Sequence, residues 1–263
     1  PYTTLFRSKD TYADGGWDAV KQDAEEKADL LLSLGINVNL APVCDMTSDE
    51  YGFMYDRSFS SDVDMENRYV RTVVETSKSK KLGTVLKHFP GYGNNSDTHT
   101  GIAYDDRDYS EFKNTDFKPF YQGIESGADC ILVSHNIVNC MDSEYPASLS
   151  QKVHDILRNE FKFDGVIMTD DLIMDAITDF TGDEAAAVTA AKCGNDLLCC
   201  SSVDTQYPAV LEAVQNGEIS EAQVDASVKR ILKWKQNLGI FSIDTYQKKV
   251  KSTEPTDTVG SEE

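Results

Sequence analysis

The segment TVLKHFPGYGNNSDTHTG, residues 84–101, begins as an apolar strand and continues as a loop rich in Gly, Asn and Ser. Lys87 and His88 interrupt the strand, and burying such polar groups is costly unless they meet a partner or a ligand. On the loop, Asp97 can hydrogen-bond one ring nitrogen of His99 and leave the other for proton transfer. The segment predicts a polar pocket with an acid/base pair, although Asp-Thr-His can also form a simple turn and His88 can be a satisfied core histidine.

Strands of the same kind alternate with helices along the chain. Each is a nearly continuous apolar run, which is typical of a parallel sheet buried on both faces. Neither a Gly-rich dinucleotide motif nor a Walker motif occurs, which disfavours a doubly wound sheet. We therefore predict an α/β fold, a TIM-like (β/α) barrel of which only five strands are present. The predicted strands are residues 36–43, 84–89, 129–135, 165–171 and 195–200.

Helix boundaries are marked by terminal signals. Gly35 follows a run of apolar residues at helical spacing and is expected to end the first helix. A further helix is predicted from Asp116 to Gly127, and Ser150 is expected to be the N-cap of the next one. Ser220 and Gln223 have the spacing of a capping box before the last helix.

Polar residues follow four of the predicted strands. In (β/α) barrels the active site forms at the C-terminal ends of the strands, so these residues are expected to meet there. Asp170 and Asp171 are adjacent, so only one of them can face the barrel mouth as a candidate nucleophile. The competing interpretation is that both cap the following helix. The residues at the strand ends are Asp45, Lys87, His88, His135, Asp170 and Asp171.

The charge balance limits the class of ligand. With 45 acidic and 25 basic residues, the 263-residue chain has a formal net charge of −20, which disfavours binding to nucleic acid or anionic lipid. No apolar run is long enough to span a membrane. We expect a monomer that binds a small, uncharged substrate. The six cysteines lack CxxC spacing and are interpreted as buried free thiols.

Metal binding is the competing use of the polar residues. His88, His99, His135 and an aspartate could form a site on such a barrel. No closely spaced pair of ligands occurs, so the sequence predicts no metal and no other cofactor.

The N-terminal segment PYTTLFRS, residues 1–8, reads as a translated sequencing adapter. We therefore interpret residues 1–8 as a cloning scar and residues 9–241 as an N-terminally truncated catalytic barrel domain. Residues 242–263 are polar and are expected to be a disordered tail. The compartment stays open between the cytoplasm and export from a bacterial cell.

Several segments together resemble the β-N-acetylglucosaminidase branch of glycoside hydrolase family 3. In chain order they are GINVNLAPVCD, YDRSF, KHFPGYG, DTH, ILVSH, YPASLS and GVIMTDDLIMDAI. The resemblance extends from about residue 17 to residue 241. It implies a retaining exo-β-N-acetylglucosaminidase that acts on cell-wall-derived or chitin-type oligosaccharides without metal or organic cofactor.

The resemblance also implies roles for individual residues. Asp170 would be the nucleophile that forms a covalent glycosyl-enzyme, and His99 would be the acid/base, polarised by Asp97. His135 is expected to line the pocket. The positions that match sugar contacts in the family are Lys87, His88, Arg57 and Asp45.

Two departures from the family pattern favour a different class of function. Tyr92 stands where the family usually has His in Pro-Gly-His-Gly, and no acidic, Gly-rich sugar-binding segment precedes the matched region. The alternative prediction is therefore a carbohydrate-binding relative with impaired catalysis.

Overall fold

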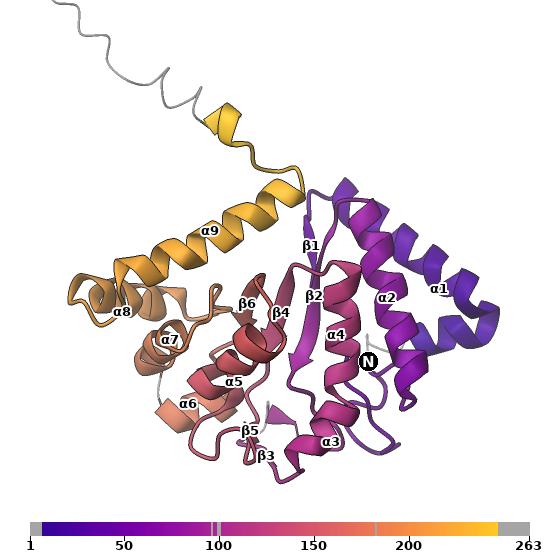
Figure 1. The fold of residues 1–263 in the computed structure, drawn as a ribbon, viewed down its shortest axis with the longest axis horizontal. Helices are drawn as coiled ribbons and strands as arrows, with labels where there is room; N and C mark the ends of the chain where they lie inside the picture. Colours follow the sequence, from indigo (N-terminus) through magenta and orange to yellow (C-terminus); the bar gives the residue numbers. More distant parts are fainter. Residues whose placement is uncertain (1–6, 96, 99–100, 182, 247–263) are drawn as a thin grey trace, which may run out of the picture.

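The protein is an α/β structure in which helices surround a parallel sheet (Figure 1). The computed structural model describes residues 7–95, 97–98, 101–181 and 183–246. The strands are β1 (Val38–Asn39), β2 (Gly83–Phe89), β3 (Tyr104–Asp105), β4 (Cys130–Val133), β5 (Ile137–Val138) and β6 (Val166–Thr169). The α-helices are α1 (Ser8–Ser33), α2 (Val63–Ser79), α3 (Tyr109–Asn114), α4 (Phe117–Ser126), α5 (Gln151–Asp155), α6 (Asp175–Thr181), α7 (Asp183–Lys192), α8 (Val203–Gln215) and α9 (Glu221–Asn237). The short segments η3 (Ala147–Leu149) and η4 (Ile156–Glu160) flank α5.

Four of the five predicted strands form one parallel sheet in the order β1-β2-β4-β6. The fifth predicted strand, residues 195–200, does not form as a full strand. This segment pairs with β6 only through an isolated bridge between Met168 and Leu197. A second, two-stranded parallel sheet, β3-β5, was not predicted. Its strands are only two residues long, which is too short for a pattern of alternating residues to reveal.

The two faces of the sheet have different cores. Alternate residues of a strand point to opposite faces, so Leu86 and Ile131 face α2 and α4, whereas Val85 and Leu132 face the interior of the barrel. The outer cluster includes Val70, Val74, Leu86, Phe120, Ile131, Val133 and Ile167. The inner cluster includes Val85, Cys130, Leu132, Val166 and Met168, and Trp234 and Leu238, from the end of α9 and just beyond it, pack against it. Fully burying one such side chain contributes about 1.5–3 kcal/mol.

The helix-end signals are largely confirmed. Gly35 has φ 78° and its amide donates to the carbonyl of Leu32 at 3.0 Å, which ends α1 as predicted. The Ser150 hydroxyl accepts from the amide of Val153 at 3.2 Å at the start of α5. Only the Ser220 half of the capping box forms. The Gln223 side-chain amide instead donates to the carbonyl of Ala191 at 2.6 Å and so ties α9 to α7.

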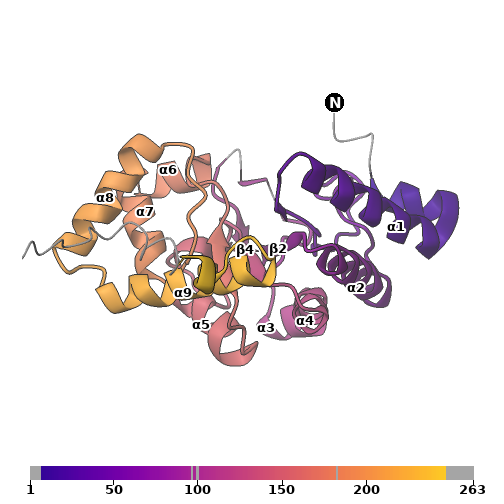
Figure 2. The same ribbon diagram turned by 90° about the horizontal axis from the view of Figure 1, so that it is seen from above.

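Helices α1 to α8 follow one another in chain order around the sheet, whereas α9 runs back toward β2 and β4 (Figure 2). Helices α1 and α2 lie at one end, α3, α4 and α5 follow, and α6, α7 and α8 lie at the other end. Since all four strands are parallel, their C-terminal ends meet on one side of the sheet. The loops that follow them form a continuous rim on which the predicted polar residues lie.

All six cysteines are free, and Cys44, Cys130 and Cys193 are buried as predicted. The predicted burial is wrong for Cys140, which is exposed, and for Cys199 and Cys200, which are only half-buried. None of the described helices is both long and apolar enough to cross a membrane. Residues 243–246 form a helical turn, and residues 247–263 lie outside the described part of the chain.

Candidate active site

The strand ends bring the predicted residues of the rim together. Lys87 follows Val85 at a spacing of two residues, and Asp170 follows Met168 in the same way, so both belong to the inner face of the sheet. Asp170 also continues the pairing of β6, because its amide donates to the carbonyl of Val133 at 3.1 Å. A side chain at residue 170 therefore points toward the barrel mouth.

His88 lies in a hydrogen-bonded row between a buried carboxylate and a guanidinium. Its Nδ1 is 2.7 Å from Asp45 Oδ2, and its Nε2 is 3.1 Å from an Arg57 terminal nitrogen. Arginine can only donate hydrogen bonds, so Nε2 accepts from Arg57 and Nδ1–H donates to Asp45. This network assigns His88 as the neutral Nδ1–H tautomer.

Asp45 holds His88 and the start of the loop after β2 through hydrogen bonds. Its side chain is fully buried and accepts three hydrogen bonds, from His88 Nδ1 at 2.7 Å, from the His88 amide at 3.0 Å and from the Tyr92 amide at 2.8 Å. Burial alone would raise the pKa of Asp45, but the interactions with His88 and the two amides outweigh it and lower that pKa. Asp45 therefore orients His88 and the start of the loop and does not present a free carboxylate.

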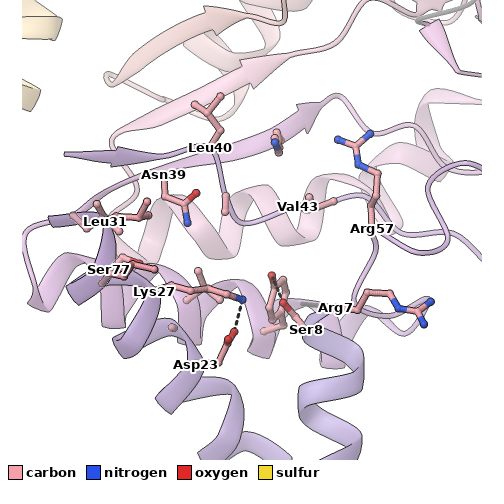
Figure 3. Close-up of a pocket in the computed structure, with 18 of the residues that line it drawn as sticks. Arg7, Ser8, Asp23, Lys27, Leu31, Asn39, Leu40, Val43, Arg57 and Ser77 are labelled. Atoms are coloured by element: carbon pink, nitrogen blue, oxygen red, sulfur yellow. Dashed lines mark hydrogen bonds and ion pairs between the residues drawn. The ribbon is translucent and has the colours of Figure 1, made fainter. Parts of the chain in front are cut away.

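Two cations, Lys87 and Arg57, lie beside these groups. Burial lowers the pKa of Lys87, and the neighbouring Arg57 charge lowers it further, while Asp170 and Asp45 act in the opposite direction. Both residues also line one end of a cavity of about 620 Å³ between α1 and the β1 and β2 strands. Figure 3 shows Arg57 at that end and residues of α1 along the cavity. Among the predicted site residues that the structure describes, Lys87 and Arg57 line this cavity and the others do not, so the cavity lies beside the site.

Asp170 and Asp171 have different environments, as the prediction required. The Asp170 side chain is 24% exposed, and its Oδ2 lies 4.0 Å from His88 Nε2. Asp171 turns away, where its Oδ1 accepts from the amides of Ile173 at 3.2 Å and Ser201 at 3.1 Å. Asp171 thus caps the turn, and Asp170 is left facing the rim.

His135 contacts the Asp170–Asp171 turn from the protein interior and does not face the rim. It is fully buried, and its Nε2 lies 3.0 Å from the carbonyl of Asp171, while its Nδ1 is 2.7 Å from the Ser148 hydroxyl. A carbonyl only accepts, so Nε2–H donates to Asp171 and Nδ1 accepts from Ser148. Burial lowers the pKa of His135 to about 4, which keeps the ring neutral near pH 7. Its visible role is to hold the turn that carries Asp170.

The loop after β2 is closely packed where it leaves the strand. Gly91 has φ 121°, and a Cβ there would lie 2.4 Å from an Asp116 carboxylate oxygen. A Cβ at Gly93 would lie 2.7 Å from an Arg107 nitrogen. Arg107 donates to Asp116 at 2.9 Å and to the carbonyl of Gly91 at 3.2 Å. The glycines of Pro-Gly-Tyr-Gly therefore let this clamp approach the backbone.

The predicted acid/base pair is only partly within the described residues. Asp97 and Thr98 are described, whereas His99 lies outside the described part of the chain. The role of Asp97 and His99 therefore stays a prediction. Thr98, between them, is fully buried, and its Oγ1 lies 2.6 Å from the Tyr92 hydroxyl.

Three contributors to the site were not predicted from sequence. Ser148 donates to His135 Nδ1, Arg107 clamps the loop, and Tyr92 contacts Thr98. Arg107 had a visible signal, an arginine within the acidic run DDRD. Ser148 and Tyr92 lay in quoted motifs, but their partners are distant or on a loop without periodicity. No group of three or more His, Cys, Asp or Glu side chains that could hold a metal occurs among the described residues.

A family model matches most of the chain. Residues 7–234 match the glycosyl hydrolase family 3 N terminal domain. The chain is 34% identical over 199 residues to a protein of Hydrogenovibrio crunogenus named beta-hexosaminidase, covering 74% of this chain and 55% of that protein. It is 31% identical over 208 residues to a beta-hexosaminidase of Nitrosomonas eutropha, covering 78% of this chain and 60% of the relative. The chain thus spans somewhat more than half the length of these two curated relatives.

Solved structures have the same fold. A glycoside hydrolase family 3 beta-N-acetylglucosaminidase from Paenibacillus superposes with a TM-score of 0.83 at 30% identity, covering 88% of this chain and 45% of that one. A family 3 glycosyl hydrolase from Mycobacterium smegmatis superposes with a TM-score of 0.77 at 29% identity, covering 85% of this chain and 71% of the other. The predicted TIM-barrel-like α/β fold is confirmed by these matches.

Proposed function

The chain belongs to glycosyl hydrolase family 3, and on that premise we propose that it supplies the catalytic centre of a retaining exo-β-N-acetylglucosaminidase. The substrate is a cell-wall-derived or chitin-type oligosaccharide with a terminal β-linked N-acetylhexosamine. Two relatives named beta-hexosaminidase and a structural neighbour described as a beta-N-acetylglucosaminidase support this choice of sugar.

The observation that carries the proposal is the environment of Asp170. Its partly exposed carboxylate lies on the inner side of the rim, 4.0 Å from His88 Nε2, while its neighbour Asp171 is used in the turn. A nucleophile must be held by its surroundings and still reach the substrate. Asp170 meets both conditions, because the Asp171 amide donates to its Oδ1 at 3.0 Å and leaves Oδ2 toward the rim.

The proposed reaction has two steps. The Asp170 carboxylate attacks the anomeric carbon as protonated His99 donates a proton to the departing glycosidic oxygen, which forms a covalent glycosyl-enzyme. Neutral His99 then takes a proton from water, and the resulting hydroxide equivalent displaces Asp170. Each step inverts the anomeric centre, so the product retains the configuration of the substrate. Asp97 stabilises the protonated form of His99.

Sugar binding is assigned to the groups around Asp170. Arg57 and Lys87 can donate charge-assisted hydrogen bonds to hydroxyl and acetamido oxygens, which suits a neutral sugar. His88 and Asp45 contribute mainly by keeping Arg57 and the loop start in place. His135 acts one step further away, through the Asp170–Asp171 turn.

The test is hydrolysis of a chromogenic β-N-acetylglucosaminide with and without a metal chelator. We expect chelator-insensitive release of the aglycone and a loss of at least about 1,000-fold in kcat for Asp170→Asn, because removing a catalytic nucleophile removes most of the rate enhancement. Asp175→Asn is the matched control, since Asp175 is exposed on α6. An activated 5-fluoro sugar should add its glycosyl mass to the unmodified chain and not to Asp170→Asn.

Full turnover by Asp170→Asn would show that the assigned nucleophile is wrong. The alternative function, a carbohydrate-binding relative with impaired catalysis, is motivated by Tyr92 in place of the family's histidine. Saturable binding of N-acetylglucosamine without any hydrolysis would favour that alternative.

A further inference from the structure

We propose that Tyr92 is a positioning residue for Asp97 and Thr98, on the loop after β2, holding Thr98 through a buried hydroxyl–hydroxyl hydrogen bond. The proposal rests on the proposed function, since it assigns the loop an acid/base role. Tyr92 stands where the family pattern usually has histidine, and a histidine has no phenol hydroxyl to make this contact.

The hydrogen bond lies in a buried environment. The Tyr92 hydroxyl and Thr98 Oγ1 are 2.6 Å apart, Tyr92 is 2% exposed and Thr98 is fully buried. Two hydroxyl groups can pair with each other because each is both donor and acceptor. Leaving either of them unpaired would carry the full cost of its desolvation. The pair therefore favours one placement of Thr98 over others.

The Tyr92 ring is itself held at its base and on its sides. Its amide donates to Asp45 Oδ1 at 2.8 Å. Its ring makes edge contacts with His88, at 5.4 Å between centroids, and with Phe53, at 5.1 Å. A tyrosine side chain has only two main rotatable bonds, so these contacts leave its hydroxyl little freedom. Tyr92 thus links Asp45 to Thr98, because its amide binds Asp45 and its hydroxyl binds Thr98.

Thr98 directly follows Asp97, so its placement restricts Asp97, to which the proposed function assigns the polarisation of His99. Effective catalysis needs the reacting groups at a defined separation, and a displacement of 1 Å can cost about 100-fold in rate. The burial of Tyr92 also raises the pKa of its phenol, so the hydroxyl stays protonated and does not compete as an acid. Its contribution is geometric: it orients a part of the loop and takes no part in proton transfer.

The experiment compares Tyr92→Phe, Thr98→Val and the double variant in the full chain. Each single change removes the hydrogen bond with little change in shape. We expect kcat to fall about 10- to 100-fold, with KM changed less than about twofold, and the double variant to be no slower than the slower single variant. Thr98→Ser keeps the hydroxyl and should recover most of kcat. The alkaline limb of the kcat/KM profile should move to lower pH, because His99 is then less well placed to be stabilised by Asp97.

Tyr109→Phe is the matched control. It also removes a phenol hydroxyl that donates a hydrogen bond, to Glu160 Oε2 at 2.7 Å, but Tyr109 is on α3. We expect wild-type kcat and an unshifted pH profile. Amide hydrogen exchange of a peptide covering residues 93–98 should rise in Tyr92→Phe and not in Tyr109→Phe.

The outcomes separate this proposal from the proposed function. If the unmodified chain hydrolyses the substrate, Asp170→Asn abolishes turnover and Tyr92→Phe is fully active, the positioning role is wrong and the glycosidase assignment stands. If the unmodified chain shows no hydrolysis, amide hydrogen exchange alone tests the positioning role of Tyr92. Faster exchange of the peptide covering residues 93–98 in Tyr92→Phe supports that role, and unchanged exchange overturns it. Equal kcat losses in Tyr92→Phe and Tyr109→Phe would also overturn it.

Discussion

Two fully buried carboxylates, Asp45 and Asp196, lie at opposite ends of the sheet and are satisfied by different kinds of partner. Asp196, at the N-terminal end, accepts from Arg158 at 2.7 Å and from Arg230 at 2.9 Å. It also accepts from Ser227 and from the amide of Ile167. Asp45, at the C-terminal end, accepts from two backbone amides and from a neutral histidine.

The difference indicates that the N-terminal end of the sheet mainly stabilises the fold, whereas the C-terminal end carries the proposed active site. At the N-terminal end, Asp196 forms ion pairs with two arginines, one before and one after it in the chain, so these cations are used within the protein. At the C-terminal end, Asp45 is satisfied without either nearby cation, and within the described residues neither Lys87 nor Arg57 forms an ion pair with a carboxylate. One Arg57 nitrogen donates to His88, and under the proposed function the remaining donors of Arg57 and Lys87 meet the ligand, at the end of the strands where active sites of (β/α) barrels form.

The largest effect on stability is expected at the N-terminal end. Asp196→Ala removes one partner from a buried charged network and leaves two arginines uncompensated, which should lower the free energy of unfolding by about 3–5 kcal/mol. Urea denaturation measures it. Asp164→Ala is the control, because the ion pair of Asp164 with Lys233 is exposed and its loss should be close to undetectable. Equal losses in the two variants would remove the distinction between the two ends.

Protonation of His135 should produce the next effect. The pKa of His135 is about 4 in the folded chain and about 6.5 in an unfolded one. Between these two pH values the unfolded state binds more protons than the folded state. The contribution of His135 to the free energy of unfolding is therefore fully present above pH 6.5 and is lost as the pH falls toward 4. The total loss is about 3 kcal/mol. Denaturation midpoints measured from pH 7 to pH 4 should show it, and His135→Gln should flatten the slope. An unchanged slope in His135→Gln would contradict the assignment.

Asp45→Asn tests whether the carboxylate sets the His88 tautomer. An asparagine keeps the shape but cannot accept from the His88 amide, His88 Nδ1–H and the Tyr92 amide together, so we expect a stability loss of about 2 kcal/mol. Affinity for the sugar should fall about tenfold if the tautomer changes and Arg57 is displaced. Calorimetric titration with N-acetylglucosamine and thermal unfolding measure the two effects. Intact affinity despite lower stability would make Asp45 a purely structural residue.

Arg57→Lys should have the smallest effect. It keeps the charge but loses the planar donor that reaches His88 Nε2, so KM should rise about fivefold, or about 1 kcal/mol, with little change in stability. Arg71→Lys, at an exposed position of α2, is the control. A KM unchanged by Arg57→Lys would show that charge alone is recognised at this position.

Much of the fold was predictable because its signals are local. Apolar runs located β2, β4 and β6, and the cap residues Gly35 and Ser150 located helix ends. The short segment at residue 197 could not be separated from a full strand, since an apolar run does not report whether a neighbour pairs with all of it. The alternation of side chains along a strand also correctly indicated that only one of Asp170 and Asp171 faces the rim.

By itself, the sequence determined the parallel α/β architecture and the presence of polar residues where the strands end, because both follow from patterns within single segments. The tertiary structure alone decided that Asp45 orients His88, that Asp171 and His135 hold the turn beneath Asp170, and that Tyr92 meets Thr98. Whether a hydrogen bond forms depends on distances of a few tenths of an ångström, mostly between segments that are far apart in the chain, and its direction depends on which partner lies there. No pattern along one segment contains that information.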